Sequence, residues 1–213
     1  MIHYLKNLKL PIPEKQIFAR LGYKNNKTQI DEATTKQIKE IIEEALVLIE
    51  PQGAYTYTKI KNKNTNTVTL DCGMTIQSKQ IAKLLLHSQY AVLLAATIGP
   101  SLGEQVKNYI NHKKLTQATI LDAVGSELAD EVANQINTIV KKEAFLKKQE
   151  TTFRYSPGYG DWGLEVQHKI SSILETQNIG LRVNKSHILV PEKSVTAIFG
   201  LTETKHKNYC STC

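Results

Sequence analysis

Strand-like and helix-like patterns follow one another in an irregular order along this sequence. Strand patterns occur at 54–60, 67–70, 90–98, 187–190 and 194–200, and helical patterns at 13–23, 31–50, 78–87, 101–112, 117–148 and 161–176. A doubly wound parallel sheet requires regular alternation of strands and helices, which this order lacks. We therefore expect an α+β fold: a twisted, largely antiparallel sheet flanked by helices, with an N-terminal helical segment.

Capping signals suggest where several helices begin and end. Asp31 precedes an apolar stripe and can accept hydrogen bonds from the first free amides of the helix that follows. Gly22 suits the end of the first helix, because glycine readily adopts the left-handed conformation found there. Asp161 is placed to cap a helix that runs to about Thr176.

The longest helical pattern, residues 117–148, carries two neighbouring stripes and could be broken along its length. Its apolar stripe consists of Leu121, Val124, Leu128, Val132, Ile136, Ile139 and Val140. Small residues form the adjacent line, at Gly125, Ser126, Ala129 and Ala133. The small residues would allow another backbone or a ligand to approach the helix closely.

The length of 213 residues suits one compact domain with an appended helical piece. We expect an N-terminal helical segment at 1–52, the main domain at 53–205 and a tail at 206–213. The longest apolar run, Tyr90–Ala96, is the length of a strand and too short to cross a membrane. The N-terminus lacks the pattern of a secretory signal, and an odd number of cysteines fits a reducing cytoplasm.

The net charge of +7 comes almost entirely from lysine. Arg20, Arg154 and Arg182 are the only arginines among 27 basic residues. Readers of nucleic-acid sequence usually rely on the arginine fork, so scattered lysines indicate a solvated surface rather than a nucleic-acid interface. An acidic protein partner remains compatible with this charge.

The most informative stretch is the loop Arg154-Tyr155-Ser156-Pro157-Gly158-Tyr159-Gly160-Asp161-Trp162. Its glycines permit sharp turns and leave backbone amides uncovered. The arginine at its entrance could bind a carboxylate through two parallel hydrogen bonds. An ordinary turn with aromatic packing is the alternative interpretation of this loop.

Four separate pieces together resemble the activation (reactivation) domain family of cobalamin-dependent methionine synthase, in its short free-standing form. They are Arg-x-x-Pro-Gly-Tyr at 154–159, Val-Pro-x-x-Ser-Val at 190–195, Ala-Ala-Thr-Ile-Gly at 95–99 and Leu-Asp-Ala-Val-Gly-Ser at 121–126. The resemblance covers about half of the chain.

The resemblance implies a set of residues that bind S-adenosylmethionine. Arg154 would hold the methionine carboxylate, the backbone of Ser156 would contact the ligand within the Pro157-Gly158 bend, and Tyr159 would pack beside it. The family also has an acidic contact on the long helix. Asp130 is the preferred match, with Glu127 and Glu131 as alternatives.

The resemblance implies reductive reactivation of a corrinoid enzyme. The chain would present S-adenosylmethionine to cob(II)alamin held by a separate methionine synthase or related corrinoid methyltransferase, with a flavodoxin- or ferredoxin-like electron donor. It would thus act as the component of a methyltransferase, without a general base of its own. The alternative is a non-catalytic partner of a corrinoid protein that docks on it or senses S-adenosylmethionine.

Two features depart from the family's pattern: the acidic contact near the family's N-terminus has no counterpart here, and Tyr209 is only a loose match for a tyrosine pair after the last strand. The chain has no cobalamin-binding Asp-x-His-x-x-Gly motif, so the corrinoid must belong to a partner. It also carries Cys210 and Cys213 as a terminal CxxC, to which Cys72 and His206 could add ligands. A closed metal site needs four ligands and the spacing does not demand one, so we expect a tail without metal.

Overall fold

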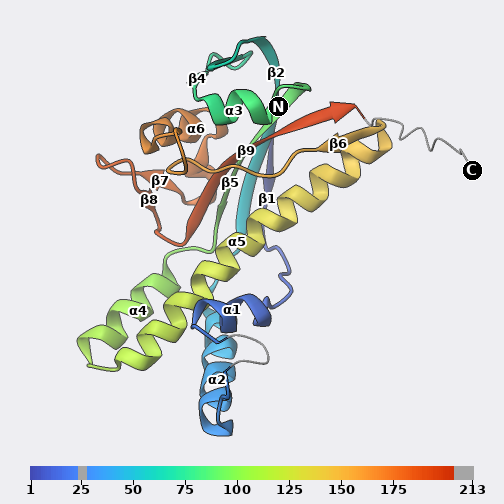
Figure 1. Ribbon diagram of the computed structural model, residues 1–213. Helices are drawn as coiled ribbons and strands as arrows, with labels where there is room; N and C mark the ends of the chain where they lie inside the picture. Colours follow the sequence, from blue (N-terminus) through green and yellow to red (C-terminus); the bar gives the residue numbers. More distant parts are fainter. Residues whose placement is uncertain (24–27, 204–213) are drawn as a thin grey trace, which may run out of the picture.

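A computed structural model of the protein describes residues 1–23 and 28–203 (Figure 1). The strands are β1 (Ile2–Leu5), β2 (Gln52–Lys63), β3 (Thr67–Leu70), β4 (Thr75–Gln77), β5 (Ser88–Thr97), β6 (Gln149–Thr151), β7 (Arg182–Val183), β8 (Leu189–Val190) and β9 (Ser194–Glu203). The α-helices are α1 (Glu14–Arg20), α2 (Glu32–Leu48), α3 (Lys79–Leu84), α4 (Ser101–Asn111), α5 (Leu115–Leu146) and α6 (Gln167–Leu174). Short 3₁₀ turns occupy Leu164–Val166 and Thr176–Ile179.

The main sheet is antiparallel at every pairing, in the order β4-β3-β2-β5-β9-β6. The long strand β2 pairs with β5 along one side, while its other side is shared between β1 and β3. A separate small ladder joins β7 to β8. The sheet and its covering helices confirm the predicted α+β class.

The central strand β5 is buried on both faces, which explains its continuous apolar sequence. Val92, Leu94 and Ala96 belong to the core beneath α5, whereas alternate residues such as Leu93 and Ala95 belong to the opposite core. Successive side chains of a strand point to opposite faces, so one strand serves both layers. Helices α3 and α6 cover the second face, and α1, α2 and α5 complete the first core.

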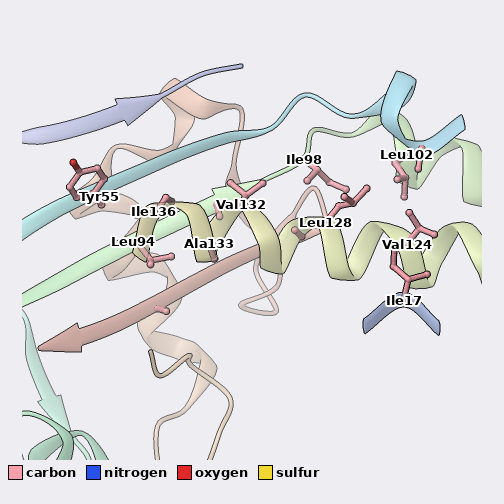
Figure 2. Packing of buried hydrophobic residues seen from close by; sticks show 14 of the residues in the cluster. Ile17, Tyr55, Leu94, Ile98, Leu102, Val124, Leu128, Val132, Ala133 and Ile136 are labelled. Atoms are coloured by element: carbon pink, nitrogen blue, oxygen red, sulfur yellow. The ribbon is translucent and has the colours of Figure 1, made fainter. Parts of the chain in front are cut away.

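Helix α5 runs without a break for 32 residues and crosses the sheet (Figure 1). Its apolar stripe packs on the strands, and Figure 2 shows Leu94 of β5 beside Ala133 and Ile136. Further towards its N-terminus, Val124 faces Leu102 of α4 and Ile17 of α1. The sequence left open a break in this helix, and the continuous apolar contact along its length removes the need for one.

The N-terminal predictions agree closely with the structure. Asp31 caps α2 by accepting a hydrogen bond from the amide of Thr34. Gly22 follows α1 with a φ of 90° and donates its amide to the carbonyl of Ala19. Segment 1–52 also contributes β1 to the sheet and Ile17 to the core. The division of the chain at residue 52 stays a prediction.

The predicted helix 161–176 is wrong at both ends. Regular helix covers only Gln167–Leu174, after a 3₁₀ turn, and Glu175 ends it in the left-handed conformation. Asp161 does not cap this helix, because its carboxylate binds the start of α3 instead. The strand predicted at 187–190 is also shorter, since His187 has a φ of 62° and the strand begins at Leu189.

Within the described ranges, no helix combines the length and the apolar character that crossing a bilayer requires.

Candidate functional site

Residues 152–155 run along the edge of β9 and lead into residues 156–162, which we call the Pro-Gly loop. Thr152 and Tyr155 donate their amides to the carbonyls of Gly200 and Ile198, and Tyr155 and Ile198 form an isolated antiparallel bridge. Because neighbouring side chains of an extended segment point to opposite faces, Tyr155 enters the core on the α3 and α6 side. Arg154 is directed to the other side, towards α5.

Arg154 and Asp130 form the ion pair at the centre of the candidate site. The Nη2 atom of Arg154 lies 3.0 Å from Oδ1 of Asp130, and their side chains are 19% and 43% exposed. The Nη1 atom of Arg154 is buried and has no hydrogen-bond partner within the described residues. A buried guanidinium donor without a partner is costly, so this atom is suited to bind an acceptor from a ligand.

The two alternative acidic residues of α5 are engaged elsewhere. Glu127 forms an ion pair with Arg20 of α1, and Glu131 accepts hydrogen bonds from Asn134 and Gln135. The structure therefore brings Asp130 to Arg154, the pair of residues that the sequence preferred. The ligand roles assigned to them remain predictions.

The Pro-Gly loop is held at both ends and exposed at its tip. Gly158 donates its amide to the carbonyl of Trp162, and the amide of Trp162 bonds the carbonyl of Tyr159. The indole of Trp162 is buried, as is Pro157, whereas Tyr159 is 68% exposed and Gly158 is exposed as well. Ser156 is half-buried between these two environments.

Gly160 fits the loop for two reasons. Its φ is 55°, and a side chain there would collide with Gln80 of α3 and with the hydroxyl of Tyr155. That hydroxyl donates a hydrogen bond to Oε1 of Gln80. The loop therefore rests directly on α3.

Asp161 fixes the far side of the loop to the same helix. Its carboxylate accepts hydrogen bonds from the Ser78 hydroxyl and from the amide of Lys79. The hydrogen bond from Ser78, supported by the Lys79 amide, lowers the pKa of Asp161 below its usual value. Ser78 in turn caps α3 through the amide of Ile81.

Lys193 is a site residue that the sequence analysis did not single out. Its Nζ atom lies 2.7 Å from Oδ1 of Asp122 and 2.8 Å from the hydroxyl oxygen of Ser126, and its side chain is 15% exposed. Ser194 beside it donates to the hydroxyl of Thr97. Two features of the sequence could have identified it: Lys193 occupies an x position of the Val-Pro-x-x-Ser-Val piece, and polar residues form a line at every fourth position on one face of α5.

That polar line consists of Asp122, Ser126 and Asp130, each four residues from the next and therefore on one face of α5. Lys193 contacts its first two members and Arg154 its third. Ala95–Thr97 pair in register with Ser194–Thr196. The fold thus gathers four pieces that lie far apart in the sequence around one part of α5.

No metal centre is evident in the part of the chain that the structure describes. No group of three His, Cys, Asp or Glu side chains gathers there to bind an ion. Cys72 is a free, half-buried thiol. Cys210, Cys213 and His206 lie outside the described residues, and the tail without metal stays a prediction.

The fold and the site define an α+β domain in which one long helix crosses an antiparallel sheet and holds an arginine loop by an ion pair. This architecture is similar to the crystal structure of the MetH reactivation domain bound to AdoHcy, with a TM-score of 0.72. The similarity covers 98% of this chain and 80% of that one, at 12% sequence identity. The chain therefore has the reactivation-domain fold.

Sequence comparison adds no further relative. No model of a known protein family matches the chain, and no curated protein matches it. At 12% identity the likeness shows the fold alone.

Proposed function

We propose that the chain binds S-adenosylmethionine beside the Arg154–Asp130 pair and presents its methyl group to a corrinoid held by a separate protein. The observation that carries the proposal is the half-satisfied guanidinium of Arg154, fixed by Asp130 and left with a buried donor. It is supported by the fold, which is shared with a domain whose crystal structure contains AdoHcy.

In this proposal the chain's own residues position a charged amino acid and perform no proton transfer. Nη1 of Arg154 donates to the ligand carboxylate, and the second oxygen of Asp130 accepts from the ligand amino group. The backbone at Ser156-Pro157-Gly158 borders the ligand, and the exposed ring of Tyr159 packs over it. A carboxylate nearby also favours the positive sulfonium electrostatically. Holding the methyl donor in one orientation is the main catalytic contribution expected of such a site.

The partner's corrinoid supplies the nucleophilic metal that accepts the methyl group, after reduction by a flavodoxin- or ferredoxin-like donor. The natural partner is a cobalamin-dependent methionine synthase or a related corrinoid methyltransferase in the cytoplasm. The chain's role in that reaction is to place the sulfonium methyl group at the surface that the partner covers.

Calorimetric titration with S-adenosylmethionine tests the proposal directly. Arg154→Ala removes a charge-assisted hydrogen bond worth about 1.5–3 kcal/mol, so its affinity is expected to fall by at least about tenfold. Arg154→Lys keeps the charge but loses the planar fork, and it should bind nearly as weakly. Arg20→Ala is the matched control, because Arg20 also pairs with a carboxylate of α5 but lies outside the site.

Two results would contradict the proposal: failure of the wild-type protein to bind S-adenosylmethionine, or equal affinity in wild type and Arg154→Ala. Formation of S-adenosylhomocysteine with a reduced corrinoid protein then separates a reactivation module from a sensor. Binding without that product would favour the non-catalytic alternative.

A further inference from the structure

The last turns of α5 carry large apolar side chains on an exposed face. Phe145 is 78% exposed and Leu146 is 84% exposed. They border a hollow of about 740 Å³ that Lys141, Lys142 and the residues of β6, Gln149–Thr151, also line. Figure 1 shows β6 beside this end of α5. The candidate methyl-donor site does not use these side chains.

Among the described residues, one side of the hollow is a sheet edge that pairs with no further strand. Strand β6 is the last strand in the sheet order and pairs with β9 on its inner side. The outer backbone groups of such a strand can pair with a further extended chain. A segment that adds to β6 would lay alternate side chains over Phe145 and Leu146.

The residues that line the hollow include two lysines and one glutamate, so the balance of charge in the lining is positive. Lys141 and Lys142 line it, whereas Lys147, outside the lining, places its Nζ over the ring of Tyr57. Glu150 is the acidic residue of the lining, whereas Glu143 accepts hydrogen bonds from the hydroxyls of Tyr55 and Tyr57. An occupant with carboxylates therefore fits this rim better than a neutral or basic one.

We propose that this surface binds an extended acidic segment of a partner protein, which adds to the edge of β6 and places one apolar side chain against Phe145 and Leu146. Residues 204–213 of the chain itself contain Lys205 and Lys207 and no Asp or Glu. They carry the same sign of charge as Lys141 and Lys142, so repulsion disfavours them as the occupant. A second copy of the chain carries the same net charge of +7. Charge complementarity thus favours a different, acidic protein.

Binding of a short labelled peptide, in which Glu alternates with Val around one central Phe, tests the proposal by fluorescence anisotropy. Lys141→Glu/Lys142→Glu should weaken binding by at least about tenfold, because two attractive contacts become repulsive. Phe145→Ser/Leu146→Ser should weaken it to a similar extent. Lys83→Glu/Lys107→Glu makes the same change of charge on α3 and α4 and should stay within about twofold of wild type at moderate salt.

Amide resonances of the full chain locate the bound peptide. Those of Gln149–Thr151 should shift and become protected from hydrogen exchange. The proposal is wrong if the peptide does not bind, if a peptide with Lys in place of Glu binds equally, or if the shifts lie away from β6.

Two other outcomes would also overturn it. Binding to phosphatidylglycerol vesicles through Phe145 and Leu146, without binding of the peptide, would make the surface a membrane contact. Self-association in ultracentrifugation that Phe145→Ser/Leu146→Ser abolishes would make it an interface between copies.

Discussion

Gly125 of α5 sits directly against α4. A methyl group at this position would lie 2.5 Å from Cδ2 of Leu102, a side chain that is fully buried. The line of small residues on α5 is thus explained here by close packing of a neighbouring helix. The sequence predicted a close approach but could not say whether a helix or a ligand made it, because both need the same absence of side chain.

Gly125→Ala tests this explanation at the level of one residue. We expect the substitution to lower the free energy of unfolding by about 1 kcal/mol, since overpacking costs more than the helix propensity of alanine returns. In a Leu102→Ala background the space is open, so the same change should stabilise the protein by up to about 1 kcal/mol. Urea unfolding of the four proteins measures both effects, and equal effects in the two backgrounds would refute the contact.

Three carboxylates on α5 were candidates for the acidic residue of the site, and the sequence alone could not decide which one contacts Arg154. Asp130, Glu127 and Glu131 lie within five positions, and sequence alone could rank but not separate them. Their partners separate them, since Arg154 contacts Asp130 and Arg20 contacts Glu127. Neither partner is close in sequence, so the distinction arises only when α1 and the loop pack on α5.

At the level of elements, α3 and the Pro-Gly loop form one unit. Ser78 caps α3 and also donates to Asp161, while Tyr155 reaches Gln80 in the same helix. An aspartate in a loop can cap any helix within reach, and sequence position suggested the following helix rather than an earlier one. The incorrect helix 161–176 has this origin, together with the burial of Trp162, which directs the chain into the core before regular helix begins.

Ser78→Ala should destabilise the protein by about 1 kcal/mol, the usual cost of losing a helix cap. Asp161→Asn keeps an oxygen acceptor for the amide of Lys79 and should have the smaller effect. Because the folded protein lowers the pKa of Asp161, its stabilising contribution is present above the usual carboxyl pKa and is lost as the pH falls through the folded value. Thermal melts at neutral and acidic pH would contradict this account if Asp161→Asn were destabilised equally at both.

Among the short strands, β3 and β8 fall within predicted strands, and four others were not predicted. β1, β4, β6 and β7 have two to four residues each, too few to establish an alternation. They exist because a longer strand or a neighbouring segment offers them backbone partners, as β2 does for β1. The long elements α2, α5, β5 and β9 bury enough side chains to produce a clear hydrophobic pattern in the sequence. They were therefore predicted to within a few residues.

At the scale of the whole molecule, an aromatic cluster joins β1, β2 and the end of α5. His3 stacks on Tyr55 with ring centroids 4.7 Å apart, and the hydroxyls of Tyr55 and Tyr57 both bond Glu143. Burial, reinforced by the charge of Glu143, raises the pKa of Tyr55 to about 12 and the pKa of Tyr57 well above its usual value. The fold therefore holds both phenols in their protonated form.

This cluster predicts a loss of stability in alkaline solution. Unfolded tyrosine loses its proton near pH 10, so the contribution of the cluster is complete below about pH 10 and declines as the pH rises through the folded values. Tyr55→Phe/Tyr57→Phe should cost about 1–3 kcal/mol at neutral pH, and its deficit relative to wild type should narrow above about pH 11. Urea midpoints across this range, with the exposed Tyr90→Phe as control, would contradict the prediction if the deficit stayed constant.

The continuity of α5 fixes a spacing across the molecule. At about 1.5 Å of rise per residue, Asp130 and Phe145 are about 22 Å apart along one unbroken rod. A rod without a hinge cannot relay a bend from one position to the other. Ligand binding near Asp130 could therefore be coupled to partner binding near Phe145 only through a second molecule that contacts both positions. The length of α5 between them sets the minimum extent of that molecule, about 22 Å.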